Sequence, residues 1–176
     1  MNKQLVLILG GVRSGKSRYA QQLASDTGKR VLFLATAEAG DDEMKHRIAR
    51  HKSSRPESWR TVEEQMDIAG ALRKNAARAD AVIIDCITVW LSNLLLHNDK
   101  LSEKEMTAEI DRLIDTYEQG EATYIIVSGE VGMGIVPEHP LGRIFRDYLG
   151  LANQRLAGKA DSVVLMVAGI AMDLKR

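Results

Sequence analysis

Short runs of apolar residues recur along the chain, separated by longer stretches whose apolar positions repeat every three or four residues. Each run is apolar throughout, which is typical of strands in a parallel sheet covered on both faces. The runs predict strands over 5–9, 31–35, 81–84, 124–127 and 163–167. The longer stretches predict helices over 16–27, 42–53, 64–77, 87–97, 103–119 and 141–158. This alternation predicts one α/β domain over 1–176, with a mostly parallel sheet, helices on both faces and ligands at the carboxyl ends of the strands.

The segment between the first strand and the first helix has the spacing of a phosphate-binding loop. It consists of Gly10, Gly11, Val12, Arg13, Ser14, Gly15, Lys16 and Ser17. This spacing turns backbone N–H groups toward a phosphate at the positive end of the following helix. Lys16 would reach the β- and γ-phosphates, and the Ser17 hydroxyl would ligate Mg²⁺. A glycine turn that binds nothing is the alternative, disfavoured because the whole pattern and its setting match. We therefore expect a P-loop NTPase-like domain.

The third apolar run ends in a carboxylate, Asp85. An acidic residue at a strand end is the usual partner of a phosphate-binding loop, where it holds Mg²⁺ directly or through water. The same residue could instead cap the helix predicted over 87–97. With the phosphate loop present, the metal role is favoured.

A strongly charged helix is predicted over 42–53, and it carries Arg47 and His51 one turn apart on one face. A solvated charged helix would explain this composition without any function. Neighbouring positive charge, however, favours the neutral, nucleophilic form of imidazole, and Arg can neutralise phosphate oxygens. His51 is therefore a candidate for attack on phosphorus. His46, His97 and His139 are alternatives that residue chemistry alone leaves open.

A glycine-rich segment, 128–138, follows the fourth predicted strand at the edge where ligands should bind. Its three glycines permit close approach of the backbone to a bulky ligand, and Glu130 could polarise a hydroxyl group. A plain mobile turn is the alternative.

Composition excludes several classes of function. Acidic and basic side chains balance at 24 each, and aromatic residues are few, so nucleic acid is not an expected partner. The single cysteine, Cys86, excludes an internal disulfide framework. No apolar run is long enough for a membrane span, and no leader pattern is recognisable, so we expect a cytoplasmic enzyme.

Several motifs together strongly resemble one family. They are the loop at 10–17, Ala35-Thr36-Ala37, Asp42-Glu43-Met44 with Arg47-Ile48 and His51, Arg55-Pro56 with 59–63, the segment 130–137 and the segment 153–157. The family is the bifunctional adenosylcobinamide kinase/adenosylcobinamide-phosphate guanylyltransferase of cobalamin biosynthesis. The resemblance covers nearly the whole chain.

This resemblance implies two reactions. The family phosphorylates adenosylcobinamide with ATP or GTP, then transfers GMP from GTP to the new phosphate through a guanylylated histidine, releasing pyrophosphate. The histidine of the family pattern matches His51. A homo-oligomer is expected, since a propeller-shaped trimer is known for the family. Nucleotide contacts are expected from 10–17, Ala35, Thr36, Ala37, Lys52, Ser53, Ser54, Arg55, Glu63 and Asp85.

Two other functions remain as alternatives. One is a small-molecule kinase of the same fold that forms no histidine adduct; the pairing of Arg47 with His51 argues against it. The other is a nucleotide-dependent switch that binds a protein, but a water-positioning glutamine and a guanine-specificity motif are not recognisable.

Overall fold

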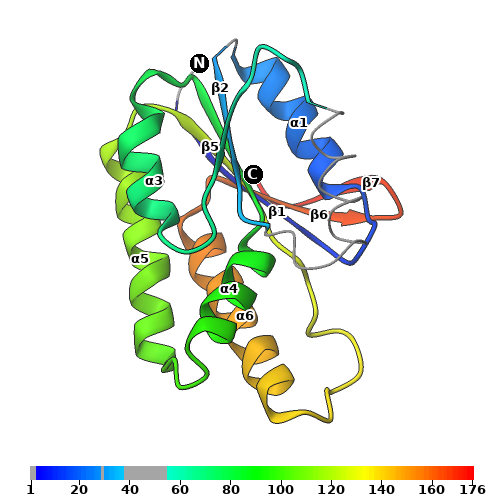
Figure 1. Cartoon of the computed structure of the whole chain (residues 1–176). Helices are drawn as coiled ribbons and strands as arrows, with labels where there is room; N and C mark the ends of the chain where they lie inside the picture. The colour runs from blue at the N-terminus through cyan, green and yellow to red at the C-terminus, as the bar shows by residue number, and fades with distance from the viewer. Residues whose placement is uncertain (1–2, 29, 38–54) are drawn as a thin grey trace.

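The computed structural model describes residues 3–28, 30–37 and 55–176, in which a single sheet organises the chain (Figure 1). Its strands are β1 (Leu5–Gly10), β2 (Val31–Ala35), β3 (Arg60–Glu63), β4 (Ala81–Asp85), β5 (Thr123–Val127), β6 (Ser162–Val167) and β7 (Ile170–Lys175). The spatial order is β3-β2-β4-β5-β1-β6-β7. All neighbours are parallel except β6 and β7. The predicted α/β fold is therefore confirmed.

Helices cover both faces of the sheet. Among the described residues they are α1 (Lys16–Thr27), α3 (Ile68–Asn75), α4 (Ile87–His97), α5 (Glu103–Gln119), α6 (Pro140–Lys159) and a short 3-10 helix, η1 (Ala76–Arg78). Alternate strand residues face opposite cores, because side chains of a strand alternate. Leu7 belongs to a core cluster that includes residues of α3, α4, α5 and α6, whereas Ile8 belongs to a second cluster that includes residues of α1. In Figure 1, α1 lies on one side of the sheet, and α3, α4, α5 and α6 lie on the other. The central strands are buried on both sides, which explains their unbroken apolar runs.

Two strands and one helix start differ from the sequence expectations. β3 and β7 lie at the two edges of the sheet, and their side chains are exposed apart from the partly buried Val62. They therefore lack the apolar runs that mark β1, β2, β4, β5 and β6. The helix expected over 64–77 is shorter, because the Asp67 carboxylate accepts a hydrogen bond from Gly70 N–H and so begins α3 at Ile68. The helix expected over 42–53 lies outside the described residues.

None of the helices described is both long and apolar enough to cross a lipid bilayer.

Candidate nucleotide-binding site

The loop between β1 and α1 has backbone geometry that its glycines permit. Gly10 has φ +145°, and a Cβ there would lie 2.4 Å from the Met166 carbonyl oxygen of β6. Gly15 has φ +98° and is the N-cap of α1. Within the described part of the chain no side chain caps α1, so the first N–H groups of the helix face the loop. This is the arrangement that binds a phosphate.

The Lys16 ammonium group lies over the loop. Its Nζ donates hydrogen bonds to the carbonyl oxygens of Gly10 at 2.8 Å and Gly11 at 2.6 Å, and lies 3.5 Å from Ser14 Oγ. The charge of Lys16 is therefore held against the backbone of the loop that would bind the phosphate oxygens.

The turn between β6 and β7 supports the loop from beside it. Gly169 has φ +83°, and its N–H donates to the Ser14 carbonyl oxygen at 3.0 Å. A Cβ on Gly15 would lie only 3.4 Å from Gly169 Cα. The edge hairpin and the phosphate loop are thus in direct contact.

The candidate residues on other strands lie at the carboxyl ends of those strands, on the same side of the sheet as the phosphate loop. Ala35 of β2 pairs with Glu63 of β3 on one side and with Asp85 of β4 on the other. Asp85 pairs in turn with Val127 of β5, which pairs with Ile8 of β1. β5 therefore separates the acidic strand end from the phosphate loop. Because all five strands are parallel, their carboxyl ends open on one side.

Asp85 does not cap α4, so the capping alternative is wrong. The N-cap is Cys86, whose Sγ accepts from Val89 N–H at 3.5 Å. Burial raises the pKa of the Cys86 thiol to about 11, and the nearby Asp85 charge acts in the same direction. The thiol is thus kept neutral, which suits a structural cysteine.

Thr36 fixes the position of the strand end at Asp85. Its side chain is fully buried, and its hydroxyl makes two 2.8 Å hydrogen bonds, accepting from Cys86 N–H and donating to the Cys86 carbonyl oxygen. The Thr36 N–H also donates to the Asp85 carbonyl oxygen at 3.2 Å. Asn93 of α4 donates to the Thr36 carbonyl oxygen at 2.9 Å. These bonds join β2, β4 and α4 at the candidate site.

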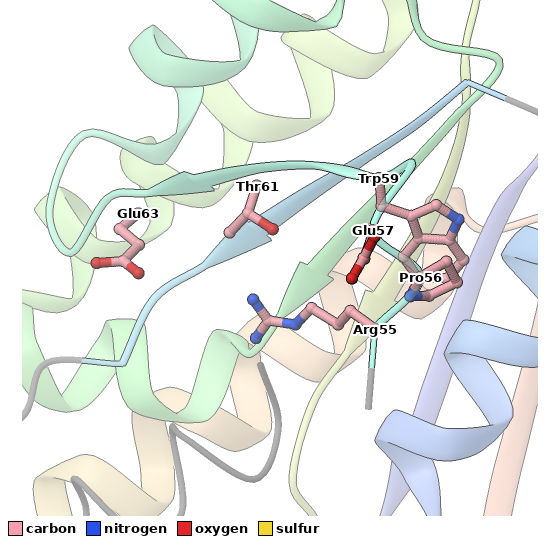
Figure 2. A pocket seen from close by; sticks show the side chains of 6 residues that line it. All are labelled: Arg55, Pro56, Glu57, Trp59, Thr61 and Glu63. Carbon is pink, nitrogen blue, oxygen red and sulfur yellow. The ribbon is translucent and has the colours of Figure 1, made fainter. Parts of the chain in front are cut away.

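A pocket of about 440 Å³ opens beside β3 (Figure 2). It is lined by Arg55, Pro56, Glu57, Trp59, Thr61 and Glu63. The Arg55 guanidinium lies 3.6 Å above the centre of the Phe33 ring, a cation–π contact. Burial lowers the pKa of Arg55 from its ordinary value, while the carboxylates of Asp85 and Glu63 act to raise it. Arg55 therefore connects this pocket electrostatically with the Asp85 strand end.

The glycine-rich segment after β5 is anchored to the phosphate loop. Glu130 N–H donates to the Gly10 carbonyl oxygen at 3.1 Å, and the Glu130 carboxylate accepts from Gly132 N–H at 2.7 Å and Met133 N–H at 3.2 Å. At its start, Ser128 donates to Asn153 Oδ1 of α6 at 2.6 Å. The start of the segment is therefore held by specific hydrogen bonds.

The structure brings many of the expected residues to one edge, and it adds others. The loop 10–17, Ala35, Thr36, Ala37, Arg55, Glu63 and Asp85 lie there, whereas His51, Lys52, Ser53 and Ser54 lie outside the described residues. The sequence assigned no role to Phe33 or Asn93, and it placed Trp59 only within the segment 52–63 expected to contact the guanine base. Trp59 stands in a quoted motif, and Phe33 is the one aromatic residue in its strand, but their contacts with the site depend on the folded chain.

The fold and the loop define a nucleotide-binding protein of the P-loop NTPase class. The crystal structure of the RadB recombinase is similar in fold, with a TM-score of 0.54 and 16% identity, covering 92% of this chain and 73% of that one. A family model described as cobinamide kinase / cobinamide phosphate guanyltransferase matches residues 6–174. The chain belongs to that family.

Curated relatives agree with the family model over nearly their whole length. The chain is 43% identical to the bifunctional adenosylcobalamin biosynthesis protein CobP of Pseudomonas aeruginosa, over 96% of each chain. It is 42% identical to the protein CobU of Salmonella typhimurium and 40% identical to that of Escherichia coli, in each case over 97% of this chain and 99% of the relative.

Proposed function

We propose that this chain phosphorylates adenosylcobinamide with ATP or GTP and then transfers GMP from GTP to adenosylcobinamide phosphate. The products of the second reaction are adenosylcobinamide-GDP and pyrophosphate. One observation carries the proposal. A complete phosphate loop lies on the same side of the sheet as Arg55, Glu63 and Asp85, and the chain belongs to this family.

In the kinase reaction, the loop 10–17 binds the triphosphate and Lys16 neutralises charge on the β- and γ-phosphates. The acceptor hydroxyl oxygen bonds to the γ-phosphorus, the bond to the β-phosphate oxygen breaks, and the hydroxyl proton passes to a base or to solvent. The residues present fit Mg²⁺, because Ser17 and Asp85 supply a hydroxyl and a carboxylate oxygen and Asp85 is not used as a helix cap. Bound Mg²⁺ would offset the negative charge of the phosphates.

In the transfer reaction, we assign the nucleophile to His51. An imidazole nitrogen bonds to the α-phosphorus of GTP and pyrophosphate leaves, giving GMP joined to histidine. A phosphate oxygen of the acceptor then bonds to the same phosphorus, and the bond to nitrogen breaks. Lys52, Ser53 and Ser54 are proposed to contact the nucleotide beside this histidine. The sequence pattern of Arg47 and His51 supports the assignment.

The pocket beside β3 is proposed to hold the guanine base. Glu63 offers a carboxylate that can accept from guanine N–H groups, while Arg55 and Trp59 offer planar groups for stacking. The Asn-Lys-x-Asp pattern of ordinary GTPases is missing from the sequence, so this pocket would replace it.

Intact-protein mass spectrometry after incubation with GTP and Mg²⁺ tests the covalent step. We expect the mass to rise by one guanylyl group, GMP less one water, and the adduct to be lost in acid but survive mild base, as a phosphoramidate does. His51→Ala should abolish the adduct and guanylyl transfer but spare phosphorylation of adenosylcobinamide, and the control His46→Ala should spare both. Absence of an adduct in the wild type would favour the simple kinase, and its persistence in His51→Ala would reassign the nucleophile.

We propose further that the enzyme acts in the cytoplasm as a homo-oligomer, a trimer by analogy with the family. The edge strand β7 supports self-association, because Ile170, Met172 and Leu174 project from the same face of the strand and are 68%, 51% and 57% exposed. Light scattering would measure the mass in solution, and a monomer at micromolar concentration would contradict this proposal.

A further inference from the structure

The segment 131–136, here called the apolar loop, exposes large apolar side chains to water. Met133 is 82% exposed, Ile135 is 96% exposed and Val136 is 58% exposed. Exposed apolar side chains are ordinary when scattered, but three of them within four residues make a patch that favours a ligand or a partner. Ile135 therefore contributes almost no buried apolar area to the stability of the folded chain.

The apolar loop is held in place by bonds at both ends. At its start, Glu130 binds the Gly10 carbonyl oxygen through its N–H and the Gly132 and Met133 amides through its carboxylate. Arg146 of α6 donates to the Gly132 carbonyl oxygen at 2.7 Å. At the far end, Arg143 donates to the Pro137 carbonyl oxygen at 3.2 Å. A loop with this many polar anchors presents its apolar side chains in a defined position.

One of these anchors ties the base of the apolar loop to the phosphate loop. It is the hydrogen bond from Glu130 N–H to the Gly10 carbonyl oxygen. In Figure 1 the chain leaves the carboxyl end of β5, runs below the turn between β1 and α1, and continues to the start of α6. An apolar ligand on this loop would therefore lie at the edge where phosphoryl and guanylyl groups are transferred.

We propose that the apolar loop binds the corrin ring of the acceptor, an inference that rests on the proposed function. A corrinoid is a broad macrocycle whose rim carries methyl groups and amide side chains, so it offers apolar area together with hydrogen-bonding groups. Met133, Ile135 and Val136 would contact the ring, while exposed backbone groups of the loop would bind its amides. A second copy of the chain is the less favoured occupant, because it would cover the edge that the acceptor must reach.

Equilibrium dialysis of cobinamide against the whole protein tests this proposal without requiring turnover. The variant carries Met133→Ser and Ile135→Ser, and the matched control is Leu96→Ser, which changes an apolar residue that is 73% exposed on α4. Losing two apolar contacts should weaken cobinamide binding roughly tenfold or more, and raise the KM of the kinase reaction similarly. The control should bind as the wild type does.

Two parallel measurements separate the possible outcomes. GTP binding by the double variant shows whether the nucleotide site is intact, and light scattering shows whether the assembly has changed. Weaker cobinamide binding with unchanged GTP affinity and mass supports the proposal. Unchanged cobinamide affinity, or a loss accompanied by a change in mass, overturns it, the latter in favour of a contact between copies. If the wild type binds cobinamide but transfers no phosphate, the proposed function fails while the binding proposal stands.

Discussion

Replacement of Thr36 by valine tests the bonds that hold the Asp85 strand end. Valine keeps the shape of threonine but removes the hydroxyl that bonds twice to Cys86 at 2.8 Å. The Cys86 carbonyl oxygen keeps a second partner, the Trp90 N–H at 3.1 Å, whereas the Cys86 N–H loses its hydroxyl partner in a buried setting. One lost hydrogen bond and one orphaned donor together predict a fall in the free energy of unfolding of about 2–4 kcal/mol.

Urea denaturation followed by circular dichroism measures this fall. With a slope of about 2 kcal/mol per M, the midpoint should drop by about 1–2 M. The control Thr36→Ser keeps the hydroxyl and loses one methyl group, so it should cost only about 1 kcal/mol. If Thr36→Val stays within about 0.5 kcal/mol of the wild type, or is no worse than Thr36→Ser, the reasoning about the hydroxyl is refuted.

Two substitutions and one labelling measurement probe the site further. Lys16→Ala should abolish triphosphate binding measured by calorimetry, because it removes the cation that the loop directs at the phosphates; near-normal GTP affinity would count against the site. Asp85→Asn should leave nucleotide binding measurable but shift the Mg²⁺ titration of activity to higher concentration, since an amide is a poorer ligand for a hard cation, and an unchanged titration would exclude the metal role. The raised pKa of Cys86, about 11, should slow its alkylation by iodoacetamide at pH 8 about a hundredfold relative to the urea-unfolded chain, and equal rates would contradict it.

The central part of the fold follows from local sequence signals. Strands β1, β2, β4, β5 and β6 are apolar on both faces, and that burial leaves a direct record in the sequence. The edge strands leave no such record, because Arg60, Thr61 and Glu63 face solvent and β7 is exposed along its length. Hydrogen bonding to one neighbour, and not burial, makes these segments strands.

The candidate site was predictable to the extent that its chemistry lies in one continuous segment. The spacing of the phosphate loop is such a segment, and Asp85 follows an apolar run. The stacking of Arg55 on Phe33 joins residues from different segments, so only the folded chain reveals it. For Ile135 the residue type itself is misleading. An apolar side chain suggests a core position, whereas Ile135 is 96% exposed.

The contact between the β6–β7 turn and the phosphate loop has a practical consequence for protein engineering. β7 follows the turn directly, and Gly169 in that turn donates a hydrogen bond to the Ser14 carbonyl oxygen at 3.0 Å. Force on a fusion partner, surface tether or crosslink attached to β7 would therefore reach the candidate phosphate loop directly. A short, rigid attachment would pass any pulling force through the β6–β7 turn and the Gly169–Ser14 hydrogen bond to the phosphate loop. A long flexible linker would decouple the two, and would be the better choice for an immobilised enzyme.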